Sequence, residues 1–128
     1  MATHTTDFWP DDIGESEMRT PVALLREQAA ALGEKTRNVV TAEVESESPS
    51  DDKFFTYSLY LVAPAIRYRY QLLTIRHPIT LYPVSVTTPK MPNYVKVGSE
   101  EDFANWLKTV LASNETKTII RALMAQSQ

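Results

Sequence analysis

Apolar side chains first recur with helical spacing between residues 20 and 33. Thr20 is a favourable N-cap, and Pro21 suits the first helical position, where its missing N–H costs no hydrogen bond. Gly33 can adopt the left-handed conformation that ends many helices. The pattern therefore predicts a helix from Pro21 to Gly33. Its inward face consists of Val22, Leu25, Ala29 and Leu32.

From residue 38 onward the spacing of apolar positions changes from about 3.6 to 2, which is typical of half-buried strands. In the segment NVVTAEVESE, Val40 and Val44 alternate with the carboxylates of Glu43, Glu45 and Glu47. The segment FFTYSLYLV alternates in the same way, so both segments are predicted to be strands with one face toward a core.

The third predicted strand follows a break at Pro64 and covers residues 67–76. Its apolar side chains occupy even positions up to Leu72 and odd positions from Leu73, so they would change faces in a regular strand. A one-residue bulge at this point would keep the apolar side chains of both halves toward the core. In the next apolar run, LYPVSVTT, Pro83 predicts an edge strand, because proline cannot donate a backbone hydrogen bond. The run YVKV predicts a short fifth strand.

After residue 98 the pattern returns to helical spacing. Ser99 is followed by three carboxylates, a capping-box-like start in which negative charge meets the positive end of the helix dipole. A last helix begins after the polar stretch SNET. The inward positions are Phe103, Trp106, Leu107, Val110 and Leu111 in the first of these helices, and Ile119, Ile120, Leu123 and Met124 in the second.

The predicted order is therefore one helix, four or five short strands, and two helices. No connection between strands is long enough to hold a crossover helix, so we predict an antiparallel meander. The helices at both ends of the chain can then cover one face of the sheet. The expected fold class is α+β with two layers.

The composition limits the possible classes of protein. A chain of 128 residues with 43% hydrophobic and 23% charged residues is typical of one globular domain. It contains no cysteine, which excludes disulfides and cysteine-ligated metals. Its first residues lack the basic flank and apolar run of a signal peptide, and its longest apolar run is too short for a membrane span. We expect a soluble, cytoplasmic protein that does not bind membranes.

The net charge of −3 conceals a segregated distribution of charge. Residues 1–17 contain five acidic and no basic side chains, and so do residues 43–52. Residues 53–98 contain six basic and no acidic side chains. Such blocks indicate that the charges bind each other or a partner. We predict a flexible acidic tail at residues 1–17 and a single domain at residues 18–128.

The sequence lacks the residue patterns of common catalytic and cofactor sites. His77 lies in the block without carboxylates, His4 lies in the tail, and three glycines leave no nucleotide-binding loop. A structural or solvent-exposed role at a strand end is expected for His77. Glu43, Glu45 and Glu47 form a line along one strand, whereas a metal ion needs ligands that converge from several elements. We therefore predict no catalytic residue, no metal site, no cofactor and no enzymatic activity.

The stretch RYRY offers the best candidate surface. Alternation along a strand places Arg67 and Arg69 on one face, and Tyr68 and Tyr70 on the other, where they are expected to pack in the core. Helices on one side of the sheet would leave the arginines on an open face, and Tyr and Arg are enriched at protein interfaces. The predicted interaction face consists of Phe54, Tyr60, Arg67, Arg69 and Gln71.

These observations favour a non-enzymatic interaction or regulatory module that binds a protein partner or self-associates through this face. The tail motif DFWPDDI, with Phe8 and Trp9, resembles a docking peptide for a basic sheet face of the same or a neighbouring chain. One alternative is a nucleic-acid-binding accessory domain, although the pI of about 5.4 opposes it. Another is a small-molecule site between helices and sheet, lined by Tyr68, Tyr70, Tyr82 and Trp106.

Overall fold

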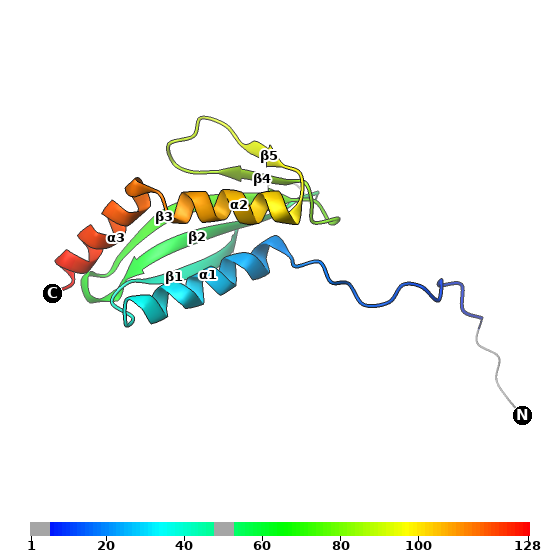
Figure 1. Ribbon diagram of the computed structural model, residues 1–128, viewed down its shortest axis with the longest axis horizontal. Helices are drawn as coiled ribbons and strands as arrows, with labels where there is room; N and C mark the ends of the chain where they lie inside the picture. Colours follow the sequence, from blue (N-terminus) through cyan, green and yellow to red (C-terminus); the bar gives the residue numbers. More distant parts are fainter. Residues whose placement is uncertain (1–5, 48–52) are drawn as a thin grey trace, which may run out of the picture.

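The computed structural model describes residues 6–47 and 53–128, and it consists of an antiparallel sheet with helices on one side (Figure 1). The five strands follow one another across the sheet in the order of the sequence. The elements are α1 (Pro21–Lys35), β1 (Thr41–Glu47), β2 (Phe55–Ala63), the short 3-10 helix η1 (Pro64–Ile66), β3 (Tyr68–His77), β4 (Val84–Thr87), β5 (Val95–Val97), α2 (Glu100–Leu111) and α3 (Asn114–Gln126).

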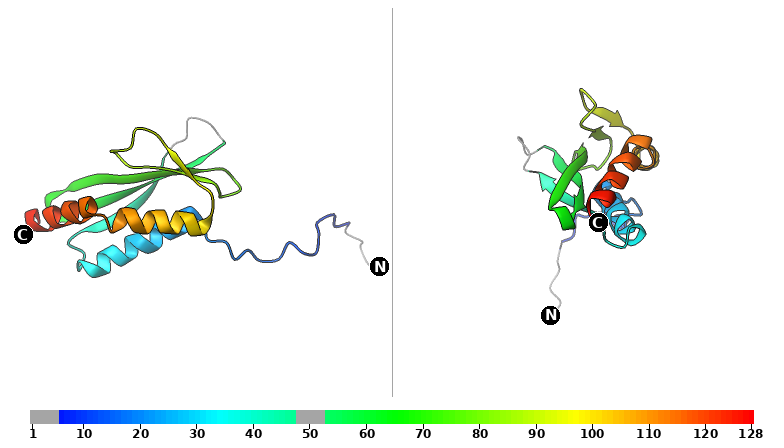
Figure 2. Two further views of the ribbon diagram at one scale, coloured as in Figure 1. Left: turned by 45° about the horizontal axis from the view of Figure 1, so that its top comes forward. Right: turned by 90° about the vertical axis from the view of Figure 1, so that its left-hand side faces the viewer.

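The predicted fold class is confirmed. An N-terminal helix, an antiparallel meander and two C-terminal helices form two layers, with all three helices against the same face of the sheet (Figure 2). The core between the layers contains fully buried side chains from both, among them Leu25 on α1, Leu59 and Leu73 on the central strands, and Phe103 on α2. Among the described residues, no helix has the length and apolar character of a membrane-spanning segment.

The end of α1 differs from the prediction. Gly33 does not end the helix but is buried within it, and the chain leaves α1 only after Lys35. The residues with positive φ are Arg37 and Asn38 in the following turn. A Cβ atom at position 33 would lie 2.9 Å from Oδ1 of Asn38, so a larger residue there would displace the Asn38 side chain. The backbone N–H of Asn38 donates to the Gly33 carbonyl at 2.8 Å. Gly33 therefore serves the close approach of the turn and not the helix end itself.

The predicted bulge in the third strand is confirmed. Leu59 faces Leu73 across the β2–β3 ladder, whereas its neighbour Tyr60 faces Gln71, so that Leu72 is the extra residue. Both Leu72 and Leu73 are buried. The bulge keeps the apolar side chains of both halves of β3 toward the helices, and it keeps the polar side chains of both halves on the opposite side.

The prediction that Pro83 lies within an edge strand is wrong. Pro83 precedes β4, which pairs with β3 on one side and β5 on the other, so the outer strand is β5. The apolar run that suggested a longer strand is interrupted because residues 78–83 form a connection, with a positive φ at Leu81. The short strand predicted at YVKV is confirmed as β5.

Arg19 connects the N-terminal ends of α1 and α2. Its backbone N–H donates to Oε1 of Glu100 (2.7 Å), and its carbonyl accepts from the Tyr82 hydroxyl (3.0 Å). Its guanidinium forms an ion pair with Glu27 at 2.9 Å. Residues 6–19 are exposed and have no regular secondary structure, so Arg19 is the point at which this tail joins the packed body.

The hydroxyl of Tyr82 makes this junction sensitive to alkaline pH. Desolvation, followed by the charge of Glu100, raises the pKa of Tyr82 from 10.0 to about 12. Between pH 10 and pH 12 the unfolded chain therefore loses a proton that the folded chain retains, and stability falls as the pH rises. Because the Tyr82→Phe variant has no hydroxyl to ionise, its free energy of unfolding is expected to decline less steeply over this range. Denaturant unfolding at a series of pH values measures both slopes, and equal slopes would contradict the prediction.

Candidate interaction surface

The side of the sheet that faces away from the helices is here called the open sheet face. No helix of the described chain covers it (Figure 2). One complete row of side chains crosses it in register, with Glu47 opposite Thr56, Thr56 opposite Arg76, Arg76 opposite Ser85, and Ser85 opposite Lys96. Alternation along the strands adds Glu43, Glu45, Ser58, Tyr60, Val62, Arg69, Gln71, Thr74 and Thr87 to this face.

Arg69 is held in a network at the β1 side of the open sheet face. Its guanidinium lies 4.1 Å from the centre of the Tyr60 ring and forms ion pairs with Glu45 and, at 3.6 Å, with Glu43. The Tyr60 hydroxyl donates to Glu47 at 3.0 Å. Desolvation and this hydrogen bond raise the pKa of Tyr60 above its ordinary value of 10.0. The charge of Arg69 is therefore largely compensated within the sheet, although each exposed pair contributes only about 0–1 kcal/mol.

The centre of the open sheet face is a patch of small polar groups that bind one another. The hydroxyls of Ser58 and Thr74 lie 2.9 Å apart, and the amide of Gln71 donates to both, at 3.0 and 2.9 Å. Ser58 is fully buried beneath its neighbours. These groups hydrogen-bond to one another, so the centre of the face is polar and carries no charged side chain.

Arg76 is the arginine of the open sheet face that has no carboxylate partner within the described residues. Its guanidinium carbon lies 4.9 Å from the centre of the Phe54 ring and 4.6 Å from that of Tyr94. Its Nε atom is buried without a hydrogen-bond partner, and no carboxylate in the described part of the chain forms an ion pair with it. The guanidinium of Arg76 is therefore held between the rings of Phe54 and Tyr94, and its Nε–H has no acceptor. A carboxylate is the usual partner of such a group.

The structure brings together most of the residues predicted for the interaction face. Tyr60, Arg69 and Gln71 lie on the open sheet face, and Phe54, just before β2, packs on Arg76. Arg67 lies outside β3, in the turn after η1 and with a left-handed backbone (φ 52°), so strand alternation does not determine the face of its side chain.

Arg76, Tyr94 and Lys96 were missed as site residues. The predicted bulge carried the signal for Arg76, since a parity switch at Leu72 returns Arg76 to the same face as Arg69. Nothing in the local sequence indicates that Tyr94 lies against Arg76, because that contact depends on how the connection before β5 folds back. Phe8 and Trp9 lie on the tail, which extends away from the packed body (Figure 1), and their side chains are exposed.

The four aromatic side chains considered from the sequence for a small-molecule site lie in different surroundings in the described structure. Tyr68 is 48% exposed, because it begins β3 beside the exposed residues of η1, at the end of the hairpin. Tyr70 is partly buried and lines a cavity of about 230 Å³ between the sheet, residues 88–91 and α2. Tyr82 binds Arg19, and Trp106 stacks on Phe103 with ring centres 6.2 Å apart. Each of the four side chains therefore has a different environment.

His77 has a structural role. Its ring is buried, lies near the rings of Phe55 and Tyr57 at 5.5 and 6.0 Å, and places Nδ1 2.7 Å from the carbonyl oxygen of Pro78. Within the described ranges, no group of three or more histidine, aspartate or glutamate side chains is arranged to hold a metal ion. His4 and two acidic residues of the block at residues 43–52, Asp51 and Asp52, lie outside those ranges.

Comparison with known proteins gives no relative from which a role could be transferred. No protein-family model matches the chain, and no curated protein or solved structure matches it either. The functional conclusion therefore depends on the geometry of the surfaces and on the chemistry of their side chains.

Proposed function

We propose that this protein is a small, cytoplasmic, non-enzymatic interaction module that binds an acidic surface of a partner protein, or of a second copy, across its open sheet face. The observation that carries the proposal is Arg76, a cation fixed between Phe54 and Tyr94 and without a carboxylate partner in the described chain. The face around it is uncovered, so an incoming protein can reach it.

The fixed position of Arg76 favours strong binding. An arginine side chain loses rotamer freedom when it is bound, and rings that already restrict the guanidinium reduce that cost. A partner carboxylate would form a charge-assisted pair with the terminal nitrogens of this guanidinium. Arginine and tyrosine are also the side chains that most often dominate the energy of protein interfaces. Arg76 and Tyr94 are therefore the proposed anchor of the interaction.

The distribution of charge across the face supports a specific orientation of the partner. Glu43, Glu45 and Glu47 lie along β1, whereas Arg76 and Lys96 lie toward β5. A partner with the complementary gradient would be accepted in one orientation and repelled in the other. A second copy has this complementarity when the two-fold axis runs parallel to the strands, because each β1 edge then meets the other β5 edge.

The same gradient weighs against a nucleic acid on this face. The three glutamates of β1 would repel phosphates, and Arg69 is already compensated by two of them. A platform for single-stranded nucleic acid combines stacking rings with an uncompensated basic groove. The observations favour a protein partner.

The decisive experiment is capture of partners from the native cell lysate with wild-type protein and with single variants. The Arg76→Ala variant is expected to weaken the interaction by about 2 kcal/mol or more, roughly thirtyfold, as for other arginine hot spots. The Arg69→Ala variant should cost less than about 1 kcal/mol, because its partner-facing charge is compensated. The matched control is Arg67→Ala, an exposed arginine in the turn outside β3.

Sedimentation velocity on the same variants tests the second-copy form of the proposal. Circular dichroism must show that each variant remains folded. Partners or dimers that are retained by Arg76→Ala as well as by Arg67→Ala would refute the proposal. If the protein binds single-stranded nucleic acid at low salt and this binding requires Arg76, the proposed protein interaction would be replaced by a nucleic-acid-binding function.

A further inference from the structure

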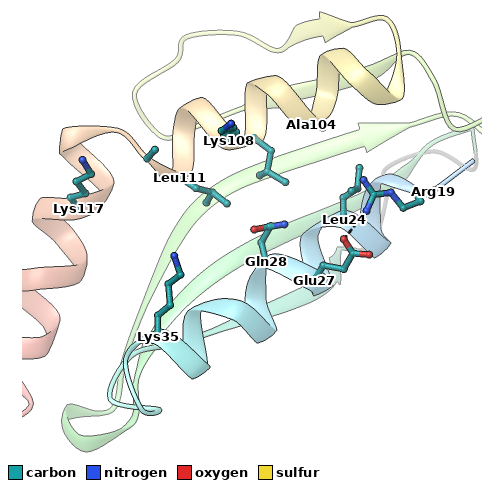
Figure 3. A pocket seen from close by; sticks show the side chains of 11 residues that line it. Arg19, Leu24, Glu27, Gln28, Lys35, Ala104, Lys108, Leu111 and Lys117 are labelled. Atoms are coloured by element: carbon teal, nitrogen blue, oxygen red, sulfur yellow. Dashed lines mark hydrogen bonds and ion pairs between the residues drawn. The ribbon is translucent and has the colours of Figure 1, made fainter.

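A second candidate surface lies on the helix side of the molecule. A cavity of about 630 Å³ opens between α1 on one side and α2 and the start of α3 on the other (Figure 3). We call it the helix groove. It is lined by Arg19, Leu24, Glu27, Gln28 and Lys35 from the first wall and by Ala104, Leu107, Lys108, Leu111, Ala112 and Lys117 from the second.

An apolar recess adjoins the helix groove at the Lys35 end of α1. It has a volume of about 240 Å³ and shares Gln28, Lys35 and Leu111 with the groove, so the two spaces adjoin. Its other lining residues are almost all apolar and come from α1, the sheet and α3: Ala31, Leu32, Ala42, Leu59, Leu61, Thr116 and Ile120. A recess of this composition can bind a hydrophobic side chain of a peptide segment, and the helix groove can bind the rest of that segment.

The helix groove is positively charged. Lys35, Lys108 and Lys117 line it from three different helices, and none of them forms an ion pair within the described part of the chain. Figure 3 shows Lys35 extending from α1 toward the opposite wall. Glu27 is the one acidic lining residue, and Arg19 neutralises it at 2.9 Å. Three uncompensated lysines therefore surround an apolar floor.

The tail of the same chain has the complementary chemistry. Residues 7–17 contain five carboxylates and no basic side chain. Three large apolar side chains on this segment have no packing partner, with Phe8 91%, Trp9 76% and Ile13 62% exposed. The tail joins the body at Arg19, which is itself a lining residue of the helix groove. The complementary segment therefore starts at the mouth of the groove.

The tail is long enough to span the helix groove. Helix α1 has 15 residues and is about 22 Å long at 1.5 Å per residue. The ten residues from Glu17 back to Phe8 reach about 33 Å when extended. A reversal of the chain just before Arg19 therefore allows Phe8 and Trp9 to reach the apolar recess while the intervening carboxylates pass the lysines.

We propose that residues 7–17 fold back into the helix groove of their own chain, with an aromatic side chain of the Phe8-Trp9 pair in the apolar recess and the tail carboxylates against Lys35, Lys108 and Lys117. The extended tail of Figure 1 is then the open form of a two-state equilibrium. Attachment at Arg19 favours the groove of the same chain over that of another, because the tail is present there at high effective concentration. This inference is independent of the open sheet face, which lies on the other side of the sheet.

The experiment uses the fluorescence of Trp9 in the full chain. The chain has two tryptophans, so a Trp106→Phe background leaves Trp9 as the sole indole. In the closed form the Trp9 emission is expected to be blue-shifted and protected from acrylamide. The Lys108→Glu and Lys117→Glu variants should each lower the ratio of closed to open form by about fivefold and red-shift the emission. High salt should act in the same direction. The Phe8→Ala variant should open the tail by roughly tenfold.

The matched control is Lys96→Glu, the same charge reversal on the opposite side of the sheet, which should leave the Trp9 emission unchanged. The emission should also be independent of protein concentration, with a monomer in sedimentation velocity. Emission of a fully exposed indole that responds to neither salt nor the groove variants would overturn the proposal. Protection that disappears on dilution would overturn it as well, because the tail would then occupy the groove of a second copy.

Discussion

Replacement of Phe103 by alanine is expected to lower the free energy of unfolding by about 4 kcal/mol. Phe103 is fully buried and is among the largest side chains in the described core. Its loss removes the transfer free energy of the ring and leaves a cavity that the surrounding strands and helices can fill only in part. Because small domains are stable by about 5–15 kcal/mol, this variant should be marginal or partly unfolded.

Urea or guanidinium unfolding, followed by circular dichroism, measures the effect. The midpoint should fall while the dependence of the free energy on denaturant stays unchanged. The Phe103→Leu variant retains most of the volume and should lose less than about 1.5 kcal/mol. A loss below about 1 kcal/mol in the alanine variant would mean that α2 is not seated in the core as described.

The position of α2 also determines the helix groove. Phe103 and Leu107 are buried on one side of this helix, while Lys108 faces the groove from the next position in the sequence. A helix that shifts to fill a cavity at position 103 would move Lys108 relative to Lys35 on α1. The stability of the core and the geometry of the charged groove are therefore linked through one helix.

The elements that were predicted well are those specified by local chemistry. The spacing of apolar side chains identified α2, and Ser99 caps it as expected, since its hydroxyl accepts from the backbone N–H of Asp102 at 3.1 Å. The parity switch between Leu72 and Leu73 identified the bulge, because only one extra residue reconciles two apolar halves of a strand. The antiparallel order followed from the shortness of the connections.

The features that were not predicted depend on contacts between distant parts of the chain. The pairing of Arg76 with Phe54 and Tyr94 requires that the residues just before β2 and just before β5 both lie against β3. Alternation indicates on which face a side chain points, but it does not indicate whether a strand extends beyond its covering helices, which is why Tyr68 is exposed. By contrast, the compensation of Arg69 by Glu43 and Glu45 agrees with the expectation, drawn from the segregated charges, that the acidic and basic blocks bind each other or a partner.

The two surfaces differ in the origin of their charge. On the open sheet face, Arg69 on β3 is compensated by Glu43 and Glu45 on β1, whereas Arg76 and Lys96 form no ion pair within the described residues. In the helix groove, the lysines come from three helices and the complementary acids are carried by the tail. The lysines of the helix groove lie outside the basic block at residues 53–98, so the two surfaces take their positive charge from different parts of the sequence. A partner on the sheet face and the tail in the groove would not compete for the same residues.

Replacement of Thr36 by valine, its isosteric apolar counterpart, is expected to cost about 2–3 kcal/mol of stability, although it removes no volume from the core. Thr36 is buried directly after α1, and its hydroxyl lies 2.6 Å from the carbonyl oxygen of Val40 and accepts from the Val40 N–H at 3.2 Å. Val40 is fully buried, so neither backbone group can turn to water when the hydroxyl is lost. Each buried group left without a partner costs about 1–3 kcal/mol.

The Thr36→Ser variant separates this hydrogen-bonding effect from packing. It keeps the hydroxyl and removes only a methyl group, so its loss should be about 0.8 kcal/mol. Hydrogen exchange provides the local readout: in Thr36→Val the Val40 amide should exchange faster than in Thr36→Ser, beyond the change in global stability. Equal stabilities of the two variants would show that the hydroxyl does not hold the turn between α1 and β1. That turn sets the position of Lys35, and through it the far end of the helix groove.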